Sequence, residues 1–176
     1  MVTLAIPLSV HDHVRGRVDA PLTLVQYGDF QCSHCARMYP MVLEIADDLG
    51  DSLAFALRHF PVSQIHPLAQ RAAEAAEAAA SQGRFWEMAT ELYENQEELD
   101  DDRLTRCARK ADLDIKRFKK EMMSGIHASR VRADYLGGVR SAVNGTPTFF
   151  MNGQLYEGPH ESAAVVAQLL KASRGR

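Results

Sequence analysis

Apolar residues in the first sixty positions follow two periods, which predict a strand, a helix and a second strand. Leu22 to Tyr27 is a short run of apolar and β-favouring residues that a Gly-Asp pair closes, and it predicts a strand. From Ser33 to Leu49 apolar residues recur at every third or fourth position, which predicts an amphipathic helix. The nearly continuous apolar run from Leu53 to Leu57 is typical of a strand covered on both faces of a parallel sheet.

The middle of the chain, residues 65–142, shows helical patterning only. An Ala-rich stretch from Leu68 to Ala80 predicts the first of five helices. Apolar positions at helical spacing mark the other four, beginning near Phe85, Leu104, Ile115 and Val131. The pair Gly137-Gly138 weakens the last of these predictions, because glycine is a poor helix former.

Strand character returns near the C-terminus. Thr148 to Met151 is followed by Asn152-Gly153, a strong hairpin signal, and then by Gln154 to Glu157. An antiparallel hairpin is therefore expected to complete the sheet. Residues Glu161 to Lys171 predict a last amphipathic helix, with Val165, Val166, Leu169 and Leu170 on one side.

Composition describes a globular protein of ordinary size. The 176 residues are 46% hydrophobic and 24% charged, with a formal net charge of -3, so one domain spanning residues 1–176 with a real core is expected. Basic residues gather only between Arg103 and Lys120, where acids interrupt them, so no nucleic-acid partner is expected.

The first residues bear on where the protein works. They lack a basic segment and include Pro7, and no run approaches the ~20 apolar residues of a membrane span. These features predict no membrane span and a cytoplasmic location. An exported, periplasmic protein trimmed of its leader would look the same.

Two of the three cysteines lie three residues apart, where the first predicted strand meets its helix. Cys32 and Cys35 would then share one helix face, with Cβ atoms about 5 to 6 Å apart, close to disulfide geometry. Free N–H groups at the helix N-terminus favour a thiolate on Cys32. We therefore predict Cys32 as the nucleophile and Cys35 as the resolving thiol.

His34 lies between these cysteines and can act on the sulfur of Cys32 as a hydrogen-bond donor or as a cation. Either effect would stabilise the reduced form and make the disulfide a stronger oxidant. His34 therefore favours a protein that donates disulfides. An exposed histidine without a role fits the same position.

Other functions fit the cysteines as well. Cys32, Cys35 and a histidine could belong to a zinc site, which needs four ligands and would define a non-enzymatic metal-binding module. A glutathione-using transferase or isomerase would not need Cys35. The remote Cys107 lies on the apolar side of a predicted helix, where a cysteine behaves as a small hydrophobic residue.

Thr146 and Pro147 lie just before the predicted strand at Thr148. Proline is tolerated in a sheet mainly at strand ends and edges. A cis bond before Pro147 would hold the Thr146 backbone where it could pair with a peptide docked at Cys32. The spacing alone favours an ordinary trans proline at a strand entrance.

Five segments in this order resemble the DsbA-like branch of the thioredoxin superfamily, a group of bacterial thiol-disulfide oxidoreductases. They are Gly28–Cys35, Arg58–Pro61, Ala72–Ala76, Phe85–Met88 and Gly145–Phe149. The resemblance implies an α/β thioredoxin fold, in which helices flank a central mixed sheet and an all-helical insert separates its βαβ and ββα halves.

For the site, the resemblance implies a Cys32-Cys35 redox pair that faces a cis-proline loop at Thr146-Pro147. It implies oxidase or isomerase activity on the thiols and disulfides of proteins or peptides. A redox partner protein or glutathione would renew the pair, and no cofactor and no metal are expected.

One position departs from that family. A glutamate that commonly helps to move the proton of the buried thiol is replaced here by Gln26. We therefore expect water or a neighbouring acid such as Asp29 to carry that proton. His59, His66 and His160 are left without an assigned role.

Overall fold

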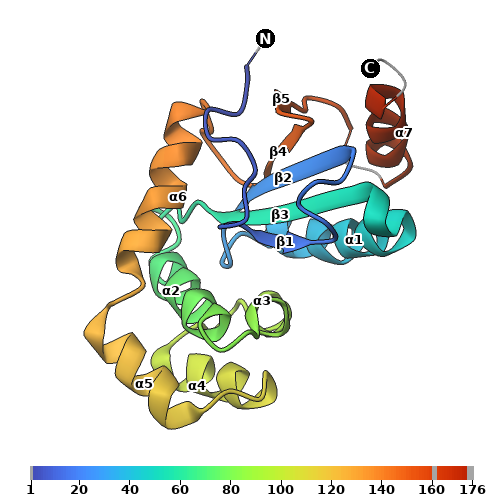
Figure 1. Cartoon of the computed structure of the whole chain (residues 1–176). Coiled ribbons are helices and arrows are strands. Elements are labelled where there is room, and N and C mark those ends of the chain that lie inside the picture. The colour runs from blue at the N-terminus through green and yellow to red at the C-terminus, as the bar shows by residue number, and fades with distance from the viewer. Residues whose placement is uncertain (1, 160–161, 174–176) are drawn as a thin grey trace.

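Five strands form one mixed sheet through the centre of the molecule (Figure 1). This computed structural model describes residues 2–159 and 162–173. The sheet order is β1-β3-β2-β4-β5; β2 and β3 are parallel, and the other neighbours are antiparallel. The strands are β1 (His13–Arg15), β2 (Leu22–Gly28), β3 (Leu53–His59), β4 (Thr148–Met151) and β5 (Gln154–Leu155).

Helix α1 (Ser33–Leu49) connects β2 to β3, so the predicted strand-helix-strand unit is confirmed. The 3-10 turn η1 (Gly50–Ser52) follows it, and β3 continues two residues beyond its predicted end. Asn152 and Gly153 both have positive φ, at 48° and 77°. Two such residues in succession are what a tight hairpin turn requires, and the turn joins β4 to β5 as predicted.

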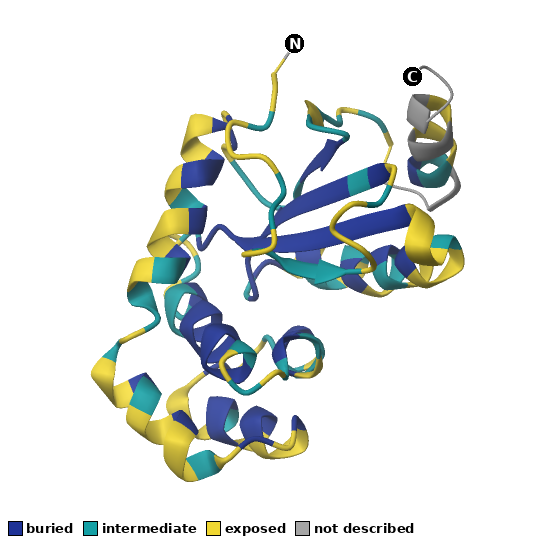
Figure 2. Ribbon diagram, in the orientation of Figure 1, coloured by how far each residue is buried: buried dark blue, intermediate teal, exposed yellow. Residues whose placement is uncertain are grey.

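Five helices lie between β3 and β4, as the periodicity predicts. They are α2 (Ala69–Ala80), α3 (Phe85–Glu94), α4 (Asp101–Lys110), α5 (Ile115–Ser124) and α6 (Ala128–Arg140). Helix α2 packs against the other four, and nine of its residues are buried (Figure 2). Its alanine content follows from this position, since small side chains let several helices approach closely.

Apolar side chains cover both faces of the sheet. Leu24 and Phe55 belong to a large core cluster with α1 and the helical insert. Tyr27, Phe60 and Phe150 form a second cluster on the opposite face, against which Tyr135 of α6 packs. Strand β2 contributes to both clusters because successive side chains point to opposite faces.

The last helix, α7 (Ser162–Ser173), packs on α1 and buries Val165 in the large cluster. The amphipathic helix predicted here is therefore present. Its predicted first residue, Glu161, and the preceding His160 lie outside the described residues, as do the side chains of Leu169 and Leu170.

Strand β1 is an element that the sequence did not indicate. It has three residues and pairs antiparallel with β3 at the edge of the sheet. Three residues are too few to establish a period, so only its tertiary pairing defines the strand.

The expectation that Gly137-Gly138 weakens the fifth helix of the insert is wrong. Helix α6 runs through both glycines, and both are buried against the sheet. A Cβ atom at Gly138 would lie 2.6 Å from Cδ2 of Phe60 and 3.1 Å from Cδ1 of Tyr27. The glycines therefore let α6 approach the sheet, and this contact outweighs their low helix propensity.

We predict that Gly138→Ala lowers the free energy of unfolding by about 1–3 kcal/mol, because the added methyl group overpacks the contact with Phe60. Urea unfolding followed by circular dichroism measures this loss. Helix propensity alone would stabilise the variant by roughly 1 kcal/mol, so a gain in stability would contradict the prediction. Gly137→Ala is the comparison, with a smaller loss expected because its nearest contact is 3.3 Å.

Candidate active site

Cys32 and Cys35 lie where β2 ends and α1 begins. Cys32 precedes the first residue of the helix, and its carbonyl oxygen accepts the N–H of Ala36 at 3.1 Å. Its own N–H donates to the carbonyl oxygen of Asp29 at 3.1 Å, which closes a tight turn between strand and helix. Both sulfurs are thiols in the structure; Cys32 retains 7% exposure and Cys35 none.

The thiol of Cys32 is strongly acidic. A hydrogen bond from the Cys35 thiol is the largest favourable cause, and it helps to lower the pKa of Cys32 to about 5. The side chain of Thr146 and the backbone N–H groups of Cys35 and His34 act in the same direction, against the opposing effect of burial. No side chain caps the first turn of α1, so these N–H groups remain available to the sulfur.

Cys35 has the opposite character. Burial raises the pKa of Cys35 far above its ordinary value, and the hydrogen bond and negative charge of Cys32 add to this effect. One sulfur is therefore a thiolate at neutral pH and the other a protonated thiol. Such a pair can attack a disulfide through Cys32 and retain the proton of Cys35 until a second step.

The loop before β4 lies against the pair. The Thr146–Pro147 peptide bond is cis, and the thiol of Cys32 donates to the carbonyl oxygen of Thr146 at 3.2 Å. Strand β4 pairs with β2, the strand that carries the cysteines, and this pairing brings residues more than a hundred positions apart into contact. Four of the five predicted site residues thus meet at one place.

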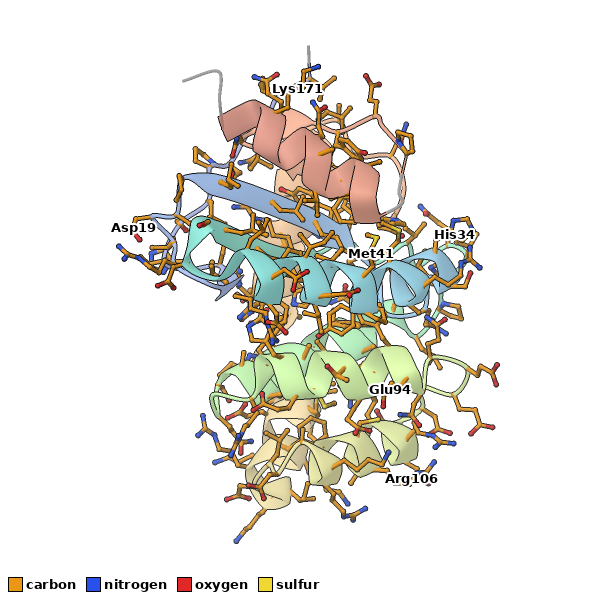
Figure 3. All side chains as sticks on the ribbon, turned by 90° about the vertical axis from the view of Figure 1, so that its right-hand side faces the viewer. Asp19, His34, Met41, Glu94, Arg106 and Lys171 are labelled. Atoms are coloured by element: carbon orange, nitrogen blue, oxygen red, sulfur yellow. The ribbon has the colours of Figure 1, made fainter. Side chains whose placement is uncertain are left out.

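His34, the fifth predicted residue, is exposed at the N-terminal end of α1 (Figure 3). Its backbone N–H, rather than its imidazole, is among the main groups that lower the pKa of Cys32. A role for the side chain stays a prediction.

Asp29 holds the turn before the cysteines in place. Its carboxylate is buried and accepts the N–H of Gln31 at 2.7 Å and that of Val62 at 2.8 Å. Nδ1 of His66 lies 2.8 Å from the same carboxylate. Three partners already engage this group, so it joins the cysteine turn to the segment 62–66; its part in proton transfer stays a prediction.

Two polar side chains near the buried thiol lack a protein partner. The amide of Gln26 and the hydroxyl of Tyr93 make no hydrogen bond within the described part of the chain. Both border Gly28, where a Cβ atom would lie 3.0 Å from the Tyr93 hydroxyl and 3.3 Å from Nε2 of Gln26. Burial raises the pKa of Tyr93, and the nearby charge of Cys35 adds to it. A polar site therefore adjoins Cys35.

The helical insert contributes more to the site than the sequence indicated. Nε2 of Gln96 donates to the carbonyl oxygens of Phe30 and Cys32, at 3.1 and 3.2 Å. Tyr93 packs on Phe30 with ring centroids 4.8 Å apart. No spacing rule connects these residues to the cysteines, because only the packing of α3 brings them there.

Cys107 takes no part in this arrangement. It is 1% exposed in α4 and belongs to the large core cluster, and burial raises its pKa. The prediction that it behaves as a small hydrophobic residue is confirmed.

Comparison with known proteins identifies the family. A family model described as thioredoxin matches residues 8–171. The chain belongs to the thioredoxin family. Its DsbA-like fold is shared with oxidised BdbD from Bacillus subtilis, which has 21% sequence identity and a TM-score of 0.85. The match covers 99% of this chain and 100% of that one. The α-DsbA2 protein of Wolbachia pipientis is 16% identical at a TM-score of 0.80, covering 96% and 89%. The predicted α/β thioredoxin fold is thus confirmed.

Curated relatives are closer in sequence but much longer. The chain is 42% identical to a protein named Na(+)/H(+) antiporter NhaA 3 from Salinispora tropica, over 98% of this chain and 26% of that protein. For Na(+)/H(+) antiporter NhaA 1 of Mycolicibacterium gilvum the identity is 44%, over 93% and 27%. The chain thus spans about a quarter of these relatives. None of the helices described here is long and apolar enough to cross a membrane.

We predict that iodoacetamide alkylates the reduced protein at Cys32 with a pH midpoint near 5, the pKa at which this thiol ionises. Mass spectrometry measures the rate and locates the modified residue. Cys35→Ala should raise the midpoint, because it removes the hydrogen bond that lowers the pKa most. A midpoint near the ordinary cysteine value of about 8.5 would contradict the assignment.

Proposed function

We propose that the chain is a protein thiol-disulfide oxidoreductase that exchanges a Cys32-Cys35 disulfide with cysteines of its substrates. The observation that carries this proposal is the difference between the two sulfurs. Cys32 is acidic and keeps some exposure, whereas Cys35 is buried and has a raised pKa. A metal site or a structural disulfide requires no such difference.

The reaction moves two electrons from two substrate thiolates to the cysteine pair, and Cys35 takes up one proton. When the pair is oxidised, a substrate thiolate attacks Sγ of Cys32, the Cys32-Cys35 bond breaks, and Cys35 takes up a proton. A second substrate thiolate then attacks the substrate sulfur of the mixed disulfide and releases Cys32 as a thiolate, which is a good leaving group because its pKa is low. The substrate gains a disulfide and the protein becomes a dithiol.

Thr146 and Pro147 support an extended peptide as the substrate. The Thr146 carbonyl lies 3.2 Å from Sγ of Cys32, so a backbone pairing there would place a substrate cysteine at the sulfur. We therefore propose protein or peptide thiols as substrates, with a redox protein or glutathione as the partner that renews the pair.

We propose that a water molecule at Gln26 and Tyr93 carries the proton of Cys35. Both side chains are buried next to Gly28 without a protein partner, and Tyr93 is close enough to Cys35 for the two groups to interact. A buried polar group left without a hydrogen bond costs about 1–3 kcal/mol. Water can satisfy both groups and exchange a proton with the sulfur. In this proposal the water molecule takes the role of the glutamate that the DsbA-like family commonly has at the position of Gln26.

The two alternative functions have less support. Among the described residues, the group of three or more potential metal ligands contains neither Cys32 nor Cys35. A glutathione-using transferase would not need the second cysteine, so it gives no reason for the buried, protonated Cys35. Ion transport belongs to the full length of the antiporter relatives and is not proposed for this chain. The predicted cytoplasmic location stays a prediction.

We expect the Cys32-Cys35 pair to be more oxidising than thioredoxin. Lowering a thioredoxin-like pKa of about 7 to about 5 stabilises the dithiol at pH 7 by at most about 2.3 kcal/mol, or about 50 mV. This effect alone raises the reduction potential from the thioredoxin value of about -270 mV to at most about -220 mV, towards the values of oxidases and isomerases.

Equilibration of the Cys107→Ala protein with glutathione buffers measures this potential. A value near about -270 mV would contradict the proposed direction of exchange, and the lack of a reversible two-electron couple would remove the redox function altogether. The same measurement on His34→Ala tests the side chain of His34, whose loss should make the potential more negative.

We predict that Gln26→Glu speeds the attack of Cys35 on a mixed disulfide by about tenfold or more, because a carboxylate can accept the Cys35 proton. Burial should raise the pKa of the new carboxyl group in the folded state above its unfolded value of about 4.3. At pH values between the unfolded and the folded pKa, the folded state then keeps a proton that the unfolded state has lost. Stability relative to the parent protein should then fall as pH rises above about 4.3, by about 1.4 kcal/mol for each unit of pKa shift.

Rapid acid quenching of a preformed mixed disulfide measures the rate, and urea unfolding at pH 5 and 8 measures the stability. Gln26→Leu, which introduces no acid, is the matched control. An equal acceleration in that variant would show that proton transfer at position 26 does not limit the step.

A further inference from the structure

Three side chains remote from each other in sequence converge at one place near Phe30. Nε2 of His13 lies 2.6 Å from Oε1 of Glu77, and Nε2 of His59 lies 2.7 Å from the same oxygen. All three atoms are within 4.8 Å of one another. The residues come from β1, from the end of β3 and from α2.

The three side chains are largely buried, and aromatic contacts hold the two imidazoles in place. His59 and Glu77 are 1% and 7% exposed at the side chain, and His13 is 16% exposed. The ring of His13 stacks on Phe85 at 3.7 Å, and His59 meets the same ring edge-on at 6.0 Å. Phe30 packs on the other side of His59 at 5.9 Å. Aromatic contacts thus direct the same nitrogen of both rings at one carboxylate.

The charged side chains around Glu77 do not neutralise its carboxylate fully, so it can bind a cation. Arg130, the nearby basic side chain, lies 3.8 Å from Oε1 of Glu77 but forms its closer ion pair with Asp134 at 2.9 Å. Asp134 also accepts the backbone N–H of His59 at 3.1 Å. The positive charge of Arg130 is therefore matched by Asp134, and a divalent ion would meet a carboxylate whose other hydrogen-bond partners are two imidazoles.

We propose that His13, His59 and Glu77 bind a divalent transition-metal ion of the zinc class, with water as the fourth ligand. Two imidazole nitrogens and one carboxylate oxygen are typical zinc ligands, whereas calcium and magnesium prefer oxygen ligands alone. Bonds of about 2.0–2.2 Å in a tetrahedron place ligand atoms about 3.3 Å apart. Oε1 of Glu77 would therefore move away from each nitrogen by about 0.6 Å, and each neutral imidazole would carry its proton on Nδ1 instead of Nε2.

The ion would connect three parts of the fold. It would attach the short edge strand β1 to β3 and both to the central helix of the insert. Phe30 belongs to the cysteine turn and packs on His59, so the metal site and the proposed redox site would adjoin each other without sharing a ligand. The sequence offered no sign of this, since 46 residues separate the two histidines and no ligand spacing is conventional.

The test titrates zinc chloride, and separately cobalt chloride, into the full chain with the Cys32-Cys35 pair oxidised, so that a disulfide removes both active-site thiols as ligands. Calorimetry gives stoichiometry and affinity, and the visible spectrum of cobalt reports ligand type and geometry. We expect one ion per chain, a tetrahedral or five-coordinate spectrum, and no sulfur-to-metal charge-transfer band.

Variants separate this site from adventitious binding. His13→Gln and Glu77→Gln should each weaken zinc binding by at least about a hundredfold, and circular dichroism should show that both remain folded. His127→Gln is the matched control, because His127 meets Glu121 at 2.7 Å without a second histidine in the described structure. Its zinc affinity should equal that of the parent protein.

Three results would overturn the proposal: no binding up to millimolar zinc, equal binding by His13→Gln and the parent, or a loss of binding in His127→Gln that matches the loss in His13→Gln. His13 is partly exposed on an edge strand, so His13→Gln keeps the test decisive if Glu77→Gln fails to fold. Redox cycling of Cys32-Cys35 is measured on the same samples, and it should persist whether or not zinc binds.

Discussion

The placement of Cys32 and Cys35 at the start of α1, where their sulfurs share a hydrogen bond, is the constraint on which the site depends. A helix leaves its first amides without intrahelical partners, and here they face the sulfur of Cys32. One turn further, the same helix carries Cys35 into the core, where no charge is tolerated. The difference between the two sulfurs thus comes from the hydrogen bond between them and from the deeper burial of Cys35, and the Thr146 side chain and the backbone N–H groups add to it.

The sheet order then determines what faces this helix terminus. Strand β2 lies between β3 and β4, parallel to β3 and antiparallel to β4. The end of β3 and the start of β4 therefore both lie beside the end of β2. The end of β3 leads to Val62, whose N–H binds Asp29, and the start of β4 brings the Thr146 carbonyl to Cys32. The helical insert adds Tyr93 and Gln96. The cysteines are local in sequence, but every other part of their surroundings is a product of topology.

Sequence patterns were informative where the determinants are local. Period and turn residues identified β2, α1, β3 and the β4-β5 hairpin, and the cysteine spacing located the redox pair. The three-residue β1 and the contacts of Gln96 were missed because each exists only through residues distant in the chain. Gly138 was misinterpreted for the same reason: propensity describes an isolated helix, whereas α6 is packed on Phe60.

The pairing of β2 on both sides has a consequence for recognition. Seven residues of this strand are in register with β3 and four with β4, so the backbone that leads to Cys32 is held from both edges. If the proposed disulfide between the sulfurs forms or opens, the main chain of β2 has little room to move. A protein substrate would then meet almost the same surface in both proposed redox states, and the negative charge of the slightly exposed Cys32 thiolate would distinguish them.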